Sequence, residues 1–256
     1  MLIVTWNING LRPEILLYME KFLQVNKPAI LCLNETKKNE KDLKLMLGKF
    51  KKYNVIVNAH NPSQWHGVAV LIRKDIDFAE VDFSLGQCET RDDNRSNDPK
   101  TGRLIAFEVN NIVFIATYSS NSGKYLSYRI DQWDKYLFIA LVKIKKPIIW
   151  LGDINVSPYP IDVSDPKKMV KWAGFTPEER ESFSSFMKRS KMIDIWRKQH
   201  PKEIKYSYRG NTGSCGMRLD NVLISPELES RVVDTGICTD CDQMSADHVP
   251  VWIFLE

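Results

Sequence analysis

Short apolar runs alternate along this chain with stretches whose apolar residues recur every three or four positions. Such short runs are typical of buried β-strands. They predict strands at residues 2–6, 29–33, 55–57, 68–72, 104–109, 112–117, 148–151, 219–224, 232–237 and 249–254. Asn110 and Asn111 stand between two of these runs and predict a tight hairpin turn, because asparagine tolerates the left-handed backbone of such turns.

The helical spacing predicts helices between the strands. Apolar residues between positions 15 and 23 fall on one face of a helix, and residues 125–143 predict a longer one. A further helix is expected to begin at Thr176, where Pro177 takes the first helical position and Glu179 the third, as in a capping box.

The order of these elements indicates the fold class. Strands that alternate with helices, together with a hairpin, favour a layered α/β domain with mixed sheets. Periodicity alone leaves the number of sheets open. The chain shows no linker composition and no internal repeat, so residues 1–256 are expected to form a single domain.

Size and composition exclude several classes of protein. The chain has 256 residues, 43% of them hydrophobic, which is enough for a core without disulfides. It has no apolar run that could span a bilayer, no recognisable signal peptide and five scattered cysteines, so we expect an intracellular protein with no membrane partner. The sequence does not decide between cytoplasm and nucleus. A net charge of +4 permits a polyanionic ligand without demanding one.

Two further segments have weaker signals. Residues 92–100 are polar without periodicity and predict an exposed loop. Cys238 and Cys241 have the spacing of half a zinc site or of a redox pair, but no second cysteine pair accompanies them.

Acids and amides gather at the ends of the predicted strands. Six polar segments have this placement: Asn7-Ile8-Asn9-Gly10, Asn34-Glu35-Thr36-Lys37, Tyr118-Ser119-Ser120-Asn121, Gly152-Asp153-Ile154-Asn155, Arg218-Leu219-Asp220-Asn221 and Ser245-Ala246-Asp247-His248. Strand ends on one rim of a sheet lie near one another, so these groups can converge on a single cleft.

The residue types in these segments suit phosphodiester hydrolysis. Carboxylate and amide oxygens are hard ligands for Mg²⁺ or Mn²⁺, whereas the four histidines include no pair at zinc spacing. Hydrolysis needs a group that takes a proton from water, for which Asp153 is suited, and a metal on a residue such as Glu35 to neutralise charge. Tyr118, Asn155 and His248 can donate hydrogen bonds to a phosphate.

Each of these residues also has a structural interpretation. Asn7 and Asn9 could cap a turn, Glu35 could pair with Lys37, and Asp153 with Asn155 could form an Asx-turn. The six segments occur together, in one order and next to strands, and this combination favours the catalytic interpretation.

Five of the six segments, all but Tyr118-Ser119-Ser120-Asn121, resemble motifs of the exonuclease III and apurinic endonuclease family. Trp6-Asn7-Ile8-Asn9-Gly10 is similar to the family's opening motif, Asn34-Glu35-Thr36-Lys37 to Gln-Glu-Thr-Lys, and Gly152-Asp153-Ile154-Asn155 to Gly-Asp-x-Asn. Residues 173–180 resemble a stretch of the apurinic endonucleases, and Asp247-His248 completes the set. The resemblance implies a four-layer α/β sandwich, with two mixed sheets packed face to face and helices outside.

The resemblance also assigns roles to individual residues. It implies catalytic roles for Asn7, Tyr118, Asp153, Asn155, Asp220 and His248, metal binding by Glu35, Asp247, Asn7 and Asp153, and substrate contacts by Asn9, Asn121 and Met217. In this scheme Asn7 orients Asp153, which activates or positions the attacking water, and Asn155 holds that water.

The remaining roles concern the phosphate and the sugar. Tyr118 would contact the phosphate or help the leaving group, and Asp220 with His248 would form a phosphate-binding dyad. Met217 stands where many apurinic endonucleases carry a tryptophan in the pocket for the abasic sugar.

The function implied is Mg²⁺- or Mn²⁺-dependent cleavage of DNA 5′ to abasic sites, with 3′→5′ exonuclease and 3′ end-cleaning activity. The expected partner is double-stranded DNA with abasic sites or blocked 3′ ends, bound by a monomer. Two alternatives stay open: another phosphodiesterase of the same superfamily (a retrotransposon-type endonuclease, a deoxyribonuclease or an inositol polyphosphate phosphatase), or a catalytically silent nucleic-acid-binding module.

Overall fold

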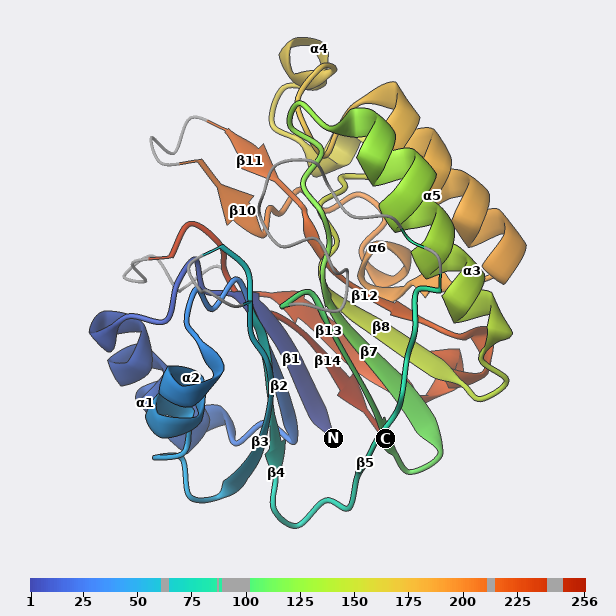
Figure 1. Cartoon of the computed structure of the whole chain (residues 1–256). Coiled ribbons are helices and arrows are strands. Elements are labelled where there is room, and N and C mark those ends of the chain that lie inside the picture. The colour runs from blue at the N-terminus through green and yellow to red at the C-terminus, as the bar shows by residue number, and fades with distance from the viewer. Residues whose placement is uncertain (61–64, 87, 89–101, 211–214, 239–245) are drawn as a thin grey trace.

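Two six-stranded β-sheets pack face to face with helices on their outer faces, which gives the four layers that the resemblance implies (Figure 1). The computed structural model describes residues 1–60, 65–86, 88, 102–210, 215–238 and 246–256. Residues 92–100 and Cys241, about which the sequence made predictions, lie outside the described residues.

The first sheet, sheet I, has the strand order β13-β14-β1-β2-β4-β3. Its strands are β1 (Leu2–Asn7), β2 (Ile30–Asn34), β3 (Tyr53–Asn58), β4 (Val68–Arg73), β13 (Val232–Ile237) and β14 (Val251–Leu255). β1 and β2 are parallel, and the other neighbours are antiparallel.

The second sheet, sheet II, has the order β5-β6-β7-β8-β12-β9. Its strands are β5 (Ala79–Glu80), β6 (Leu104–Val109), β7 (Ile112–Tyr118), β8 (Ile148–Asp153), β9 (Ile193–Asp194) and β12 (Asp220–Ile224). Only β7 and β8 are parallel here, so both sheets are mixed, as predicted. A separate two-stranded ribbon joins β10 (Tyr208–Arg209) to β11 (Gly216–Met217).

The helices lie outside the two sheets. Those over sheet I are α1 (Pro13–Asn26) and α2 (Glu40–Leu47), and those over sheet II are the π-helix η1 (Tyr128–Asp134), α3 (Lys135–Lys143) and α5 (Pro177–Ser190). Shorter helical segments are η2 (Pro160–Asp162), α4 (Pro166–Met169), α6 (Ile195–Gln199) and η3 (Pro226–Arg231). Among the described residues, no helix combines the length and the apolar composition of a membrane span.

The strands consist of continuous apolar residues because one face of each sheet packs on the other sheet and the opposite face packs on helices. On β1, Ile3 packs between the sheets, whereas the next residue, Val4, packs under α1. On β7, Phe114 faces the other sheet and Ile115 faces the helices. Alternate residues therefore supply the central layer and the two outer layers of the core.

The local predictions are largely confirmed. Asn110 and Asn111 form the turn between β6 and β7 with φ of 49° and 62°. The Thr176 hydroxyl accepts from the backbone of Glu179, and the Glu179 carboxylate accepts from the backbone of Thr176, which completes the predicted capping box.

Two differences from the prediction have physical reasons. The predicted helix 125–143 begins as the π-helix η1 and becomes α-helical only at Lys135, a change of winding that apolar periodicity does not report. Helix α2 was not predicted because it is short and half of its residues are charged, with only Leu43 and Leu47 buried.

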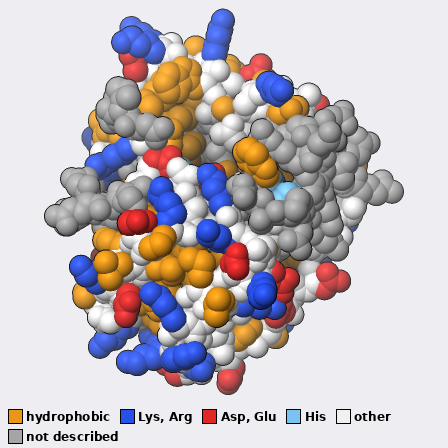
Figure 2. Space-filling view, turned by 60° about the vertical axis from the view of Figure 1, so that its left-hand side comes forward, with side chains coloured by type: hydrophobic (Ala, Val, Ile, Leu, Met, Phe, Trp, Pro, Cys, Tyr) orange, Lys and Arg blue, Asp and Glu red, His pale blue; other side chains and the backbone are white. Residues whose placement is uncertain are grey.

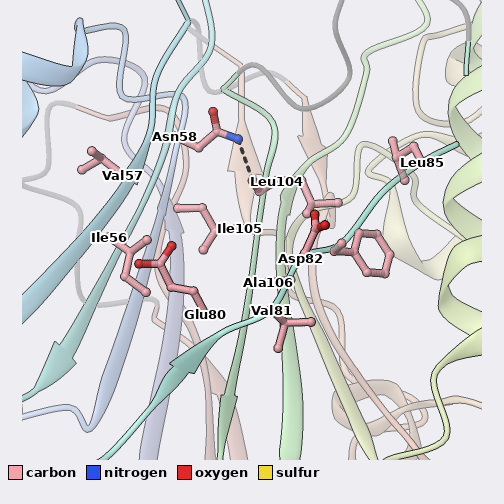
Figure 3. A pocket seen from close by; sticks show the side chains of 11 residues that line it. Ile56, Val57, Asn58, Glu80, Val81, Asp82, Leu85, Leu104, Ile105 and Ala106 are labelled. Carbon is pink, nitrogen blue, oxygen red and sulfur yellow. Dashed lines mark hydrogen bonds between the residues drawn. The ribbon is translucent and has the colours of Figure 1, made fainter.

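An asparagine joins the two sheets at the edge where β3 and β6 approach each other. Asn58 on β3 donates to the carbonyl of Leu104 at 2.7 Å and accepts from the amide of Gly102 at 2.8 Å (Figure 3). Beside it, a cavity of about 250 Å³ opens between the sheet edges, lined by Ile56, Ile105 and the acids Glu80 and Asp82 among others.

Gly152, near the end of β8, is required by the close approach of β7. Its φ is 139°, and a Cβ atom there would lie 1.9 Å from the carbonyl oxygen of Thr117. No side chain fits without moving the strand that carries Asp153.

We therefore expect Gly152→Ala to lower the free energy of unfolding by at least about 3 kcal/mol, because a backbone clash adds to an unfavourable φ. Gly86→Ala is the matched control, since its φ is also positive, at 63°, but a Cβ there meets nothing within 4 Å. Its cost should be about 1 kcal/mol in the same urea titration. Equal losses for the two variants would contradict the steric explanation.

Candidate active site

The polar segments predicted from the sequence meet at one rim of the sandwich, between the two sheets. The parallel strands β1 and β2 end there on sheet I, and β7 and β8 end there on sheet II. Strand β12 begins at the same rim, where Asp220 lies opposite Asp153. The predicted convergence on one site is therefore found for the strand ends.

Asn7 is the fully buried centre of this site. Its Nδ2 donates to Oε2 of Glu35 at 3.0 Å and to Oδ2 of Asp153 at 2.9 Å, which links the two sheets. Its Oδ1 accepts from the backbone amide of Asn9 at 2.9 Å. The turn-capping interpretation of Asn7 is thus correct as well, and the same side chain also orients two carboxylates.

Asn9 and Lys37 extend the network over sheet I. Lys37 forms an ion pair with Oε1 of Glu35 at 2.8 Å and donates to Oδ1 of Asn9 at 2.5 Å. Asn9 in turn donates to Oδ1 of Asp247 at 3.0 Å. Glu35 and Asp247, the predicted metal ligands, are thereby held in one hydrogen-bonded chain.

Asn155 and Asn121 extend the network over sheet II. The backbone amide of Asn155 donates to Oδ1 of Asp153 at 2.9 Å, which is the Asx-turn considered from the sequence. Its side chain donates to the carbonyl of Ser119 at 2.9 Å and accepts from Nδ2 of Asn121 at 3.1 Å. Asn121 is exposed and Asn155 is buried, so the pair runs from the surface to Asp153.

Backbone strain is concentrated at this rim. Asn9, Glu35 and Asn155 have φ of 44°, 56° and 52°. Non-glycine residues in the left-handed region cost energy and persist where the surrounding contacts hold them. Such strain is common at functional sites, and here it affects three predicted site residues.

Asp153 lies in a buried and strongly negative environment. Burial raises the pKa of its carboxyl to about 7, and the charges of Asp220 and Glu35 act in the same direction. The charge of His248 and the hydrogen bond from Asn7 oppose this rise. A carboxylate with a pKa near neutrality is a better proton acceptor than an ordinary aspartate.

Tyr118 is held as a neutral phenol. Burial raises its pKa well above the ordinary value, as do the negative charges of Glu35 and Asp153, and Arg103 opposes the shift. The phenol is hydrogen-bonded to Glu35, and the guanidinium carbon of Arg103 lies 5.3 Å from the ring centroid. Tyr118 is therefore a hydrogen-bond donor at the rim rather than a base.

Asp220 and His248 form the predicted dyad. Nδ1 of His248 lies 2.6 Å from Oδ2 of Asp220, and both side chains are buried. Burial alone lowers the pKa of His248, but the charge and hydrogen bond of Asp220 outweigh it and, with Asp153 and Asp247, raise the pKa to about 10. The imidazole is consequently positively charged at neutral pH.

The charges at the rim fit a divalent cation. Four carboxylates lie here, those of Glu35, Asp153, Asp220 and Asp247, and the cations among them are Lys37 and His248. The buried Oδ1 of Asp220 has no hydrogen-bond partner among the described groups. The raised pKa of Asp153 reflects its burial first and the neighbouring negative charges second, and a bound divalent ion would relieve the latter.

Met217 lies apart from this network. It is 3% exposed and packs with Val163, Met169, Phe175 and Leu219 in a small cluster of its own. Only a small part of its side chain is open to a sugar.

Sequence reasoning missed the role of Asn34. It is fully buried at the end of β2, donates to the carbonyl of Thr117 at 3.0 Å, and its Oδ1 accepts from the amide of Asp153 at 3.0 Å. Asn34 therefore ties sheet I directly to β7 and β8. Its position beside Glu35 in a polar strand end was the available signal.

Arg218 was quoted as part of a motif but was given no role. Its buried guanidinium binds Asp162 through Nε at 2.7 Å and Asp194 through Nη2 at 2.6 Å. Because Arg218 directly precedes the Leu219-Asp220 pair, this ion-pair network fixes the start of β12 and hence Asp220.

Comparison with known proteins agrees with this geometry. Residues 4–248 match the model of the endonuclease/exonuclease/phosphatase family. The chain belongs to this family. A DNA-(apurinic or apyrimidinic site) endonuclease of Dictyostelium discoideum is 31% identical over all of this chain and 71% of its own length. An exodeoxyribonuclease of Bacillus subtilis is 31% identical over all of this chain and 99% of its own length.

The fold agrees as well. The structure of an AP endonuclease from Archaeoglobus fulgidus superimposes with a TM-score of 0.82 at 26% identity, and covers 100% of this chain and 99% of the other. The expected membership of the exonuclease III and apurinic endonuclease branch, and its α/β sandwich, are confirmed.

The His248 pKa predicts how stability depends on pH. A histidine whose folded pKa is raised contributes stability that is complete below its unfolded pKa, near 6.5, and is lost as the pH rises through the folded value, about 10. In metal-free buffer, the free energy of unfolding of wild type relative to His248→Gln should fall between these pH values. The slope should be at most about 1.4 kcal/mol per pH unit.

Asp220→Asn tests the cause of the shift, because it keeps the histidine and removes the carboxylate charge. It should flatten the pH dependence as His248→Gln does. Wild-type slopes in both variants would mean that the dyad is not charged as described.

Proposed function

We propose that this chain is a metal-dependent DNA-repair phosphodiesterase that cleaves the backbone 5′ to abasic sites and also acts at 3′ ends as an exonuclease and end-cleaning enzyme. The observation that carries the proposal is the convergence of Asp153, held by Asn7, with the charged Asp220–His248 dyad at one rim. The relatives named as an apurinic site endonuclease and an exodeoxyribonuclease support the choice of DNA.

Asp153 is the proposed acceptor of the proton from the attacking water. Without a metal its pKa is about 7, and a bound divalent ion would lower that pKa and keep the carboxylate ionised, ready to accept a proton. Asn7 and the amide of Asn155 hold both carboxylate oxygens, so the carboxylate cannot rotate away from the water. The Asn155 side chain, tied to Asn121, is proposed to position that water and the substrate.

His248 and Tyr118 are the proposed phosphate donors. The imidazolium of His248, kept charged by Asp220, can bind a phosphoryl oxygen and stabilise the negative charge that develops on it. The neutral phenol of Tyr118 can donate to a phosphate oxygen or to the leaving oxygen. His248 is positioned before the substrate binds, whereas the hydroxyl of Tyr118 would exchange its hydrogen bond with Glu35 for one with the substrate.

A divalent ion, Mg²⁺ or Mn²⁺, would be held by Glu35 and Asp247 with Asn7 and Asp153 beside them. When bound, it would supply positive charge to the phosphoryl oxygens and the leaving group. Carboxylate oxygens are the ligands that such ions prefer. Asp153, Asp220 and His248 also have possible ligand atoms within 4.8 Å of one another, but Nδ1 of His248 is already bound to Asp220.

The surface is compatible with a DNA substrate. Lysine and arginine side chains project over much of the face in Figure 2. Lys167, Lys168 and Lys171 are exposed on and after α4, which projects at the rim end of the molecule. Such cations can bind DNA phosphates on either side of the site.

We propose that one chain acts as a monomer within the cell, since it carries every proposed site residue. The proposed contact of Met217 with the abasic sugar is limited to the small part of its side chain that is exposed.

The test is cleavage of an end-labelled duplex with one abasic analogue, beside its undamaged and 3′-phosphate counterparts, in Mg²⁺ and in EDTA. We expect a single Mg²⁺-dependent cut 5′ to the lesion. Asp153→Asn should lower that rate at least about 1,000-fold, because general base catalysis and charge balance are both lost, while DNA binding persists.

Asp75→Asn is the control, since Asp75 is a surface acid paired with Arg73. It should cleave as wild type does. If the wild-type protein shortens only the undamaged duplex, or removes only the 3′ phosphate, the main activity is at DNA ends. If it cleaves none of the three, the proposal is wrong, and inositol phosphates or DNA binding without cleavage are the next candidates.

A further inference from the structure

A buried arginine lies behind the site loops, in the π-helix η1. Arg129 is 2% exposed, and its Nε donates to Oδ1 of Asp134 at 2.7 Å. The two residues are five positions apart. In an α-helix, such residues point about 140° away from each other, whereas the wider π-helix brings them together. The unusual winding of η1 is therefore what allows this ion pair.

The rest of the guanidinium binds two loops at once. Nη1 of Arg129 donates to the carbonyl of Ser120 at 2.6 Å and to that of Asn155 at 3.2 Å, and Nη2 donates to the carbonyl of Ile154 at 2.9 Å. Ser120 lies in the loop after β7, and the other two residues lie in the loop after β8. The arginine thus joins the two loops that carry Asn121 and Asn155.

Other contacts also hold these loops, such as the amide of Ile154 with the carbonyl of Leu219 and the side chain of Asn121 with Oδ1 of Asn155. Asn155 has a left-handed φ of 52°, which the surrounding contacts must maintain. The amide of Ser119 donates to the carbonyl of Asp153 at 2.8 Å, and the side chain of Asn155 returns to the carbonyl of Ser119 at 2.9 Å. A shift of any of the three carbonyls that Arg129 binds would therefore move Asn155 relative to Asp153.

The positive charge of Arg129 is neutralised by the adjacent carboxylate of Asp134. Asp134 is also buried, and its second oxygen accepts from the hydroxyl of Ser182 on α5 at 3.0 Å. The pair is linked in this way to the helical layer outside sheet II. Because its charge is neutralised, Arg129 orients backbone carbonyls with its planar guanidinium and does not attract phosphate.

From this arrangement we propose that Arg129 is a positioning residue, which aligns the loops after β7 and β8 so that Asn155 and Asn121 meet the substrate beside Asp153. This role of Arg129 depends on the proposed function at one point, the contact of Asn155 and Asn121 with DNA. The π-helical turn with Asp134 and the link to Ser182 hold the guanidinium in its orientation. A lysine has one ammonium group and cannot reproduce four hydrogen bonds in a plane.

The experiment compares wild type with Arg129→Lys, Asp134→Asn and Ser182→Ala by hydrogen–deuterium exchange and by single-turnover cleavage. Exchange of peptides covering residues 117–123 and 152–157 should become faster in Arg129→Lys. Its cleavage rate should fall about 100-fold, as expected for a small misplacement of reacting groups. The DNA concentration for half-saturation should change less than about threefold, since the lost contacts bear on orientation rather than on binding.

The other variants give a graded series that does not depend on Arg129→Lys folding well. Asp134→Asn keeps an acceptor for Nε and should lose about 10-fold in rate, and Ser182→Ala less. Phe138→Ala is the matched control. It removes a ring that stacks on Phe186 at 4.1 Å and contacts Trp150 on β8, so it destabilises the same layer without removing any hydrogen bond of the loops.

The outcomes separate the two proposals. Wild-type exchange and cleavage in both Arg129→Lys and Asp134→Asn would overturn the role of Arg129. So would an equal loss of rate in Phe138→Ala, because the effect would then follow stability alone. If wild type cleaves no DNA, the proposed function fails, but the exchange measurement still decides whether Arg129 holds the loops.

Discussion

The two sheets are joined at the rim by the side-chain amides of two buried asparagines, and the rest of the site depends on this junction. Asn34 binds the amide of Asp153 and the carbonyl of Thr117, and Asn7 bridges the carboxylates of Glu35 and Asp153. A neutral amide offers donors and acceptors together, so one side chain can satisfy groups of both sheets. An apolar residue would leave buried polar atoms unpaired, at about 1–3 kcal/mol each.

The junction also explains the electrostatics of the site. Because it brings the ends of β2, β8 and β12 together, it crowds the carboxylates of Glu35, Asp153 and Asp220 into a buried space. Burial and the neighbouring negative charges raise the pKa of Asp153. The negative charges of Asp220, Asp153 and Asp247 keep His248 protonated against the opposing effect of its own burial. A divalent cation would relieve the same crowding, so the proposed proton acceptor, phosphate donor and metal site share one physical origin.

Much of the fold could be predicted from the sequence, because it depends on local chemistry. Strands that are buried on both faces consist of continuous apolar residues. The pair Asn110-Asn111 favours the turn that it forms, and Thr176 with Glu179 caps the start of the helix that follows. The two-residue strands could not be predicted, since strands such as β9 exist only through pairing with a distant neighbour.

The site was predictable where residue type and strand position coincide, as for Asp153, Glu35 and His248. The positioning residues were not, because Asn34, Arg129 and Arg218 act through contacts with carbonyls, amides and acids far away in the sequence. The same limit applies to η1, whose winding is explained by an ion pair five residues apart and by the loops that Arg129 reaches. Met217 is a different case. Its position in the motif suggests a substrate contact, but its packing leaves only 3% of the residue exposed.

The central claim, that the junction between the sheets sets the chemistry, is tested most directly by single-turnover cleavage of the abasic duplex by Asn34→Ala and Asn58→Ala. Both asparagines join the two sheets through backbone groups, but only Asn34 contacts Asp153. Each variant should lose about 2 kcal/mol of stability. We predict that Asn34→Ala loses about 100-fold in rate and Asn58→Ala less than about threefold. Equal rates in the two variants, at equal stability, would contradict the account.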